Sequence, residues 1–288
     1  MNLALGTAQF GLDYGISNST GRTPPDEVKR ILISAREKGI DTLDTAVAYG
    51  DSEAVLGCVG VGDWRVVSKV PPFQKSSIDG KEWVRHHLRE SLKRLGIERL
   101  DGLLLHRYSD LLGEAGHEIA AGLCEVKADG LVGKVGYSIY SPQPLKELVQ
   151  IMPPDLIQVP LNVVDQRLVT SGWLYKLLDM GVEVNTRSVF MQGLLLMTPE
   201  KRPPNFNKWN ELLLRWDAAV GGCREKALAL CLGFAKTHPG ISRVVVGVES
   251  LTHLNQLLKI WERAASFDAA GFACGDPQLV EPSNWKLE

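Results

Sequence analysis

Three successive apolar segments of this chain each end on a residue that can carry or exchange a proton. The first ends on the carboxylate of Asp44, the second on the ammonium of Lys69 and the third on the imidazole of His106. A phenol, Tyr49, lies in the turn that follows the first segment. If these segments are neighbouring parallel strands of one sheet, their carboxyl ends meet at one edge and the four side chains converge there.

This combination of groups can polarise a carbonyl bond and donate a proton to its oxygen. A phenol titrates at a pH of about 10, which is too high for an efficient proton donor at neutral pH. The ammonium of Lys69 would stabilise the phenolate of Tyr49 and lower its pKa. Asp44 can hold Lys69 by a charge-assisted hydrogen bond, and His106 can orient a carbonyl oxygen or join the proton path.

Each of the four residues also has a simpler explanation when it is considered alone. Asp44 could cap the helix that is expected to begin near Ser52, and Lys69 could be a surface residue at a strand end. His106 could be a core histidine with satisfied hydrogen bonds, and Tyr49 could only seal a turn. The occurrence of all four at successive strand ends favours the joint functional interpretation.

Strands and helices alternate along the whole chain, which predicts an α/β fold. The strands are near-continuous runs of Val, Ile and Leu, typical of a parallel sheet that is buried on both faces. Eight strand–helix units close into a single (β/α)8 TIM barrel, which we expect to span residues 1–288 as one domain. We expect strands at residues 3–5, 39–44, 65–70, 100–106, 133–138, 156–161, 182–188 and 244–248. We expect helices at 23–38, capped by Thr23, and at 52–56, 77–95, 118–127, 142–151, 169–180, 208–219, 223–236 and 252–265, before a loop-like tail that folds back over a barrel end.

The composition is that of an ordinary globular protein, with 44% hydrophobic and 23% charged residues. The net charge of −2 indicates neither a nucleic acid nor a membrane as partner. The amino terminus lacks the basic segment and long apolar core of a secretory signal. Five cysteines without a CxxC pair predict reduced, mostly buried thiols and a cytoplasmic location. We predict no metal site, and the oligomeric state stays open.

The four candidate residues lie in motifs that resemble those of the aldo-keto reductases, a family of (β/α)8 barrels. The similar motifs are Asp44-Thr45-Ala46-x-x-Tyr49-Gly50, Ser68-Lys69 and Leu105-His106. The resemblance implies that a nicotinamide cofactor, NADPH or NADH, passes a hydride to the carbonyl carbon of a small aldehyde or ketone. It also implies that Tyr49 is the general acid and that Lys69, held by Asp44, adjusts its pKa. His106 would then orient the substrate.

The resemblance further implies where the cofactor binds. Residues after the fifth and sixth strands would hold the nicotinamide amide, those after the seventh the pyrophosphate, and those after the eighth the adenosine ribose. Helix amino termini and the loops after the last two strands are general anion sites of such barrels. The cofactor-binding candidates are Gly6, Thr7, Asp44, Ser138, Gln158, Arg187, Ser188, Gln192, Gly193, Leu194, Gly247, Glu249, Ser250 and His253.

The choice between the two cofactors depends on Glu249, which stands where NADPH-dependent members often have arginine. A carboxylate repels the 2′-phosphate of NADPH and accepts a hydrogen bond from a ribose hydroxyl, which favours NADH. Alternatively, Glu249 points to solvent while Ser250, His253 and Arg243 meet the phosphate. Both interpretations stay open.

Two other functions also stay open. Arg187 stands where many members stack an aromatic ring on the nicotinamide, and Ile139 replaces a frequent asparagine. These departures are compatible with a cofactor-binding regulatory protein that has little or no turnover. A lyase or isomerase that uses Lys69 as a Schiff-base amine is the third possibility, and the spacing of Asp44 and Tyr49 disfavours it.

Overall fold

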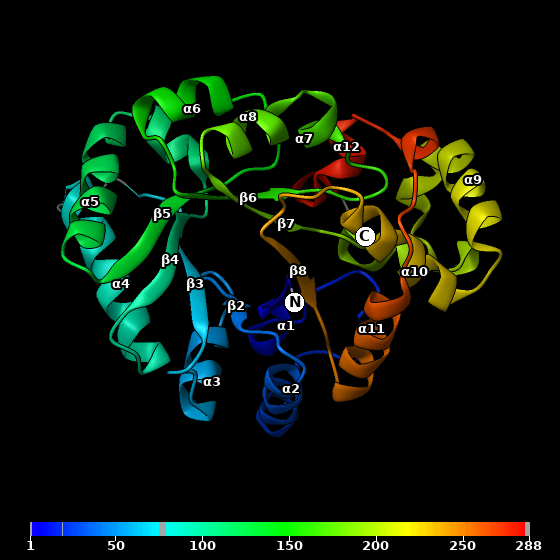
Figure 1. The fold of residues 1–288 in the computed structure, drawn as a ribbon, viewed down its shortest axis with the longest axis horizontal. Coiled ribbons are helices and arrows are strands. Elements are labelled where there is room, and N and C mark those ends of the chain that lie inside the picture. Colours follow the sequence, from blue (N-terminus) through cyan, green and yellow to red (C-terminus); the bar gives the residue numbers. More distant parts are fainter. Residues whose placement is uncertain (1, 19, 75–78, 286–288) are drawn as a thin grey trace.

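The computed structural model describes residues 2–18, 20–74 and 79–285, and these form a closed barrel of eight strands. Each strand is parallel to the next in sequence order, and the last pairs with the first. Helices surround the strands on the outside (Figure 1). The expected (β/α)8 barrel is therefore confirmed. The strands are β1 (Leu3–Gly6), β2 (Thr42–Asp44), β3 (Arg65–Val70), β4 (Leu100–Leu105), β5 (Val132–Ser138), β6 (Leu156–Pro160), β7 (Glu183–Arg187) and β8 (Arg243–Gly247).

Alternate side chains of the strands fill the inside of the barrel. Val67 of β3, Leu104 of β4 and Leu156 of β6 form one buried cluster. Because β4 and β6 are not neighbours in the sheet, this contact crosses the barrel interior. Gly102 leaves room for the cluster, since a Cβ there would lie 2.9 Å from the Leu156 side chain. Side chains two positions further along each strand also face inward. They are Lys69, His106 and Gln158.

The helices pack their apolar faces against the outer surface of the barrel and form the larger of the two cores. The α-helices are α1 (Ala8–Gly11), α2 (Pro25–Glu37), α3 (Ser52–Val59), α4 (Gly80–Leu95), α5 (Gly116–Ala128), α6 (Leu145–Ile151), α7 (Arg167–Thr170), α8 (Trp173–Asp179), α9 (Asn210–Val220), α10 (Arg224–Lys236), α11 (Leu251–Arg263) and α12 (Pro277–Val280). The 3-10 helices are η1 (Tyr108–Leu112), η2 (Met191–Leu196), η3 (Pro199–Lys201), η4 (Pro204–Trp209), η5 (Ala270–Phe272) and η6 (Pro282–Asn284).

Several helix starts differ from the expectation by two or three residues, and those of α2 and α4 bear on the capping residues. The prediction that Thr23 caps α2 is wrong, because no side chain among the described residues caps this helix. The Thr23 hydroxyl donates instead to the carbonyl of Glu249 at 3.3 Å. Thr23 thereby ties the start of α2 to the loop after β8. The start of α4 was expected at Ser77, which lies outside the described residues. The described helix follows Asp79, whose carboxylate caps it.

The segment after β6 and the carboxyl-terminal tail pack against each other. The single helix expected at 169–180 is two helices, because Gly172 between α7 and α8 has a left-handed φ of 75°. The tail contains η5, α12 and η6, and it does fold back onto the chain. Cys274 donates its backbone N–H to the carbonyl of Val164 at 2.9 Å. Arg167 forms an ion pair with Glu281 at 2.8 Å, which fixes the tail beside the loop after β6.

The cysteines are more exposed than expected. Cys231 is buried and Cys274 is half-buried, whereas Cys58, Cys124 and Cys223 are exposed. The expectation of mostly buried thiols is therefore wrong, because three of these side chains lie on the solvent faces of outer elements rather than against the barrel. None of the described helices combines the length and apolar character that crossing a bilayer requires.

Candidate functional site

The barrel brings the four candidate residues to its carboxyl-terminal end. Asp44 is the last residue of β2, and Tyr49 lies in the turn between β2 and α3. Lys69 lies near the end of β3, and His106 directly follows β4, with its N–H bonded to the carbonyl of Val70. Lys69 and His106 occupy inward-facing positions, so they lie above the apolar cluster inside the barrel.

Asp44 and Lys69 form a buried ion pair. The Lys69 ammonium lies 2.8 and 2.9 Å from the two carboxylate oxygens of Asp44 and 2.9 Å from the carbonyl of Thr45. The side chain of Lys69 is 1% exposed and that of Asp44 is 6% exposed. Burial lowers the pKa of Lys69, and the charge of Asp44 opposes this effect. Gln158 adds a third donor, with its amide nitrogen 2.6 Å from Asp44.

Tyr49 stands between the ion pair and His106. Its ring centroid lies 5.1 Å from the Lys69 ammonium and 5.8 Å from the His106 ring, which it meets edge to face. The expected lowering of its pKa is wrong for this structure. Burial raises the pKa of Tyr49, and the charge of Asp44 raises it further, while Arg187 opposes both. Burial is the main cause, because the loss of water disfavours the charged phenolate more than the neutral phenol.

His106 is neutral at physiological pH. Burial, followed by the charges of Lys69 and Arg187, lowers the pKa of His106 to about 3. Its Nδ1 atom is buried and has no hydrogen-bond partner among the described residues. A neutral imidazole carries one donor nitrogen and one acceptor nitrogen. It can therefore donate to a carbonyl oxygen without carrying charge into the site.

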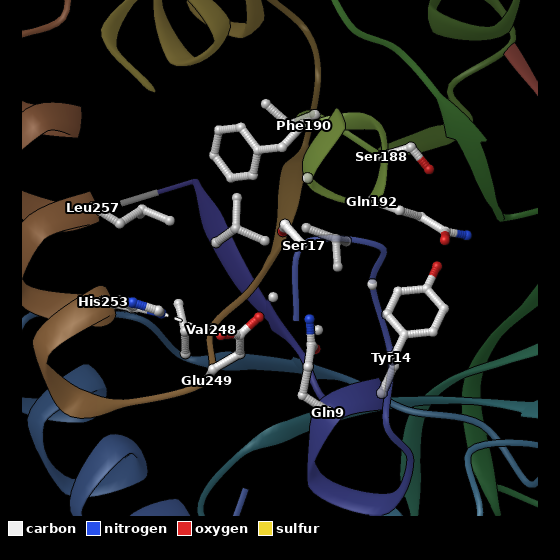
Figure 2. A pocket seen from close by; sticks show the side chains of 18 of the residues that line it. Gln9, Tyr14, Ser17, Ser188, Phe190, Gln192, Val248, Glu249, His253 and Leu257 are labelled. Carbon is white, nitrogen blue, oxygen red and sulfur yellow. Dashed lines mark ion pairs between the residues drawn. The ribbon is translucent and has the colours of Figure 1, made fainter. Parts of the chain in front are cut away.

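A cleft of about 1090 Å³, part of it open to solvent, extends from Asp44 and Tyr49 towards the start of α11. Figure 2 shows that its walls come from the loops after β1, β7 and β8. Ten of the fourteen cofactor-binding candidates line it. They are Gly6, Thr7, Asp44, Arg187, Ser188, Gln192, Gly193, Gly247, Glu249 and His253.

The other four candidates do not line the cleft. Leu194 is fully buried in the outer core, and the Ser250 side chain caps α11 by accepting from the backbone of His253. Ser138 and Gln158 are paired neighbours on β5 and β6 and are almost fully buried, and Gln158 donates to Asp44, which does line the cleft.

Arg243, which one interpretation placed at a phosphate, lies at the opposite end of the barrel. It is the first residue of β8 and contacts Thr42, the first residue of β2, and Asp41, which precedes that strand. That placement is therefore wrong, because a strand start and a strand end are separated by the length of the barrel.

The loop after β7 is strained where it lines the cleft. Ser188, Met191 and Gln192 have φ angles of 62°, 46° and 52°, and no other non-glycine residue described here has a positive φ. Ile16 in the loop after β1 donates its N–H to the carbonyl of Gln192 at 3.1 Å, which joins the two loops. Strain of this kind concentrates at binding and catalytic sites.

The cleft suits an extended dinucleotide that ends near Tyr49. Gln158 has a buried amide oxygen with no partner among the described residues, so it is free to accept from a carboxamide N–H. At the other end, Glu249 and His253 lie 3.7 Å apart across one turn at the start of α11 (Figure 2). Gly247 brings the backbone close to the cleft, since a Cβ there would lie 2.7 Å from the Gln9 amide.

Several lining residues are absent from the expectation based on sequence. Tyr14 lies in the loop after β1, and its hydroxyl interacts with the side chain of Gln192 (Figure 2). Arg224 at the start of α10 also lines the cleft. The only local signal is that Tyr14 precedes a glycine, and no pattern in the sequence links these segments. The missed lining residues are Ala8, Gln9, Tyr14, Gly15, Ser17, Val189, Phe190, Leu196, Arg224, Leu228, Val245, Val246 and Gln256.

Known proteins resemble this chain over most of its length. The NADH-specific methylglyoxal reductase of Escherichia coli K12 is 27% identical over 195 residues, covering 58% of this chain and 57% of that protein. The chain therefore matches little more than half the length of this relative. An aldo-keto reductase of Mycolicibacterium vanbaalenii is 26% identical over 231 residues, which cover 72% of this chain and 75% of the relative.

Solved structures share the fold. The holo form of an aldo-keto reductase from Bacillus halodurans aligns with a TM-score of 0.73 at 21% identity, covering 94% of this chain and 89% of that one. At this identity the likeness concerns the fold alone. The model of the aldo/keto reductase family matches residues 2–271, which is nearly the whole chain. The chain therefore belongs to the aldo/keto reductase family.

Proposed function

We propose that this protein reduces an aldehyde or ketone to an alcohol with NADH or NADPH, and that Tyr49 is the general acid. The observation that carries the proposal is the convergence of four groups on one end of the barrel. Lys69 is bound to Asp44 at 2.8 Å and lies 5.1 Å from the Tyr49 ring centroid, and Tyr49 contacts His106. The cleft begins at this point.

The four residues have different roles in the reduction of the carbonyl group. The neutral imidazole of His106 and the hydroxyl of Tyr49 donate hydrogen bonds to the oxygen and polarise the bond. Because burial raises the pKa of Tyr49, the phenol keeps its proton until the oxygen gains negative charge. Tyr49 then transfers the proton, and the nearby Lys69 stabilises the phenolate that forms. Asp44 keeps Lys69 charged and in place.

The cofactor supplies the hydride for the carbonyl carbon when it is bound. Gln158 and Ser138 would hold the carboxamide end, the loop after β7 the phosphates, and Glu249 the ribose at the far end. Glu249 is largely shielded and lines the cleft, with 18% of its side chain exposed. Its carboxylate would repel a 2′-phosphate and accept from a ribose hydroxyl, so we propose a preference for NADH. A relative described as NADH-specific supports this choice.

The role of Tyr49 is tested by the Tyr49→Phe variant. We expect kcat for carbonyl reduction to fall by about 10²- to 10⁴-fold, which is the usual contribution of a general acid. The dissociation constant of NADH, measured by quenching of protein fluorescence, should stay nearly unchanged. Tyr175→Phe is the matched control, because this phenol is 57% exposed. Unchanged turnover in Tyr49→Phe would refute the role. Saturable cofactor binding without turnover in the unmodified protein would favour a regulatory function instead.

The cofactor preference is tested by Glu249→Gln, which removes the charge and keeps the shape. We expect the affinity for NADPH to rise by about tenfold, since a repulsion of roughly 1 kcal/mol or more is removed. The affinity for NADH should change much less. Glu262→Gln on the exposed face of α11 controls for net charge. A protein that already binds NADPH more tightly than NADH would contradict the proposal.

A further inference from the structure

The guanidinium of Arg187 lines the cleft close to the reacting groups and carries charge that no carboxylate in the described part of the chain compensates. It is the last residue of β7, and its charge acts on the pKa values of both Tyr49 and His106. No carboxylate of the described residues lies within ion-pair distance of it. Two of its five N–H donors are used, by the hydroxyl of Ser188 and the carbonyl of Ile139, both at 3.2 Å.

The neighbouring Arg167, unlike Arg187, forms ion pairs with carboxylates. Arg167 is bound to Asp165 at 2.8 Å and to Glu281 at 2.8 Å, and these contacts raise its pKa. Asp165 is thereby already used. Two carboxylates line the same cleft as Arg187: Asp44 is likewise occupied by Lys69 and Gln158, and Glu249 lies beside His253. Among residues 2–18, 20–74 and 79–285, Arg187 is therefore left without a counter-charge of its own.

Arg187 is also held in one orientation. Its guanidinium carbon lies 4.4 Å from the ring centroid of Tyr140, so one face of the group is covered by the phenol. The three remaining N–H donors lie in the guanidinium plane, at its edge. A half-buried, oriented and uncompensated guanidinium of this kind matches the planar, two-oxygen geometry of a carboxylate.

We propose that Arg187 binds a carboxylate of the substrate, so that the substrates are carbonyl acids: aldehydes or ketones that also carry a carboxylate. This assignment rests on the proposed reductase function and specifies its substrate class. The carbonyl oxygen of the substrate lies at Tyr49 and His106, and its carboxylate lies at Arg187. The ring of Tyr140 holds the Arg187 guanidinium in place. Neutral carbonyl compounds then react without this contact.

The experiment compares ω-oxo carboxylates of increasing length with their methyl esters, using the full chain with NADH. The variants are Arg187→Met, Arg187→Lys and, as a control for net charge, Arg215→Met on the exposed face of α9. In Arg187→Met we expect kcat/KM for the best oxo acid to fall by about 10- to 100-fold, as for a lost charge-assisted pair. The methyl ester should change by less than about threefold, and Arg187→Lys should recover only part of the loss.

A binding measurement reads the same site without turnover. Titration of butanoate into the NADH-bound protein should give a dissociation constant that rises by about tenfold or more in Arg187→Met and stays unchanged in Arg215→Met. Failure of the reductase function would leave this difference intact, so the two failures are distinguishable. Equal losses for acid and ester, with weaker NADH binding, would assign Arg187 to the cofactor and overturn the proposal. Unchanged kinetics and butanoate binding in Arg187→Met would overturn it as well.

Discussion

The buried pair of Asp44 and Lys69 makes a strong prediction about stability. In Lys69→Met the carboxylate of Asp44, whose side chain is 6% exposed, loses the two hydrogen bonds that the ammonium donates and keeps only that from Gln158. Leaving such a charge uncompensated costs about 3–5 kcal/mol, a large fraction of the roughly 5–15 kcal/mol that stabilises a typical domain.

The reverse variant, Asp44→Asn, costs less. The Lys69 side chain keeps the carbonyl of Thr45 as an acceptor, and burial already lowers its pKa, so it can shed its proton. We expect a loss of about 1–3 kcal/mol. The double variant buries no charge and should also lose about 1–3 kcal/mol. The coupling between the two positions is then about 3 kcal/mol or more.

The assay is urea unfolding at pH 7, followed by far-UV circular dichroism and tryptophan fluorescence. Coincident transitions would justify a two-state treatment of the free energies. The exposed pair of Lys81 and Glu125, 2.6 Å apart, serves as the control, and its single losses should simply add. If the losses at Asp44 and Lys69 also add within about 0.5 kcal/mol, the ion pair at the base of the site does not exist.

Three further predictions follow from individual side chains. His106 has a pKa of about 3 in the fold, so the unfolded chain binds a proton first as the pH falls. The contribution of His106 to the free energy of unfolding is complete above pH 6.5 and is lost towards pH 3 at roughly 1.4 kcal/mol per pH unit. The free energy of unfolding of His106→Asn should therefore depend less on pH between about 6 and 4 than that of the unmodified protein. An unchanged slope would contradict this. Gly193→Ala should weaken NADH binding and lower the free energy of unfolding by about 1–3 kcal/mol more than Gly181→Ala does. Both glycines have a positive φ, but only a Cβ at position 193 would clash with another side chain, that of Ser17. Equal effects of the two substitutions would disprove the contact. Thiol labelling of the native protein should leave Cys231 unmodified until denaturant is added, while the exposed Cys58, Cys124 and Cys223 react at once; early labelling of Cys231 would contradict its burial.

The sequence alone determined the architecture and the chemical identity of the site. Runs of Val, Ile and Leu separated by amphipathic segments predict parallel strands with covering helices, because only that arrangement buries such strands on both faces. Asp44, Lys69 and His106 stand at the ends of successive strands, and parallel strands bring successive ends together. Helix boundaries were less reliable, as at Thr23, because a cap depends on the neighbouring loop as well as on the local residues.

Only the tertiary structure decided which side chains face one another. Ser68 and Lys69 are adjacent polar residues of β3, and a strand that is apolar on both faces carries no alternation to separate them. Closure of the barrel turns Lys69 inward to Asp44 and Ser68 outward, where its hydroxyl bonds to Glu53 of α3 at 2.5 Å. The raised pKa of Tyr49 likewise follows from burial and from the Asp44 charge, which depend on packing.

The long-range contacts of the cleft were equally beyond the sequence. Gln158 reaches Asp44 across 114 positions of the chain. Arg187 stacks on Tyr140, and Ile16 binds the loop after β7, although no local pattern connects these segments. The physical reason is that local sequence sets the strands and the polarity of their ends, whereas strand register and barrel closure set which groups lie within hydrogen-bonding distance and how much water remains around them.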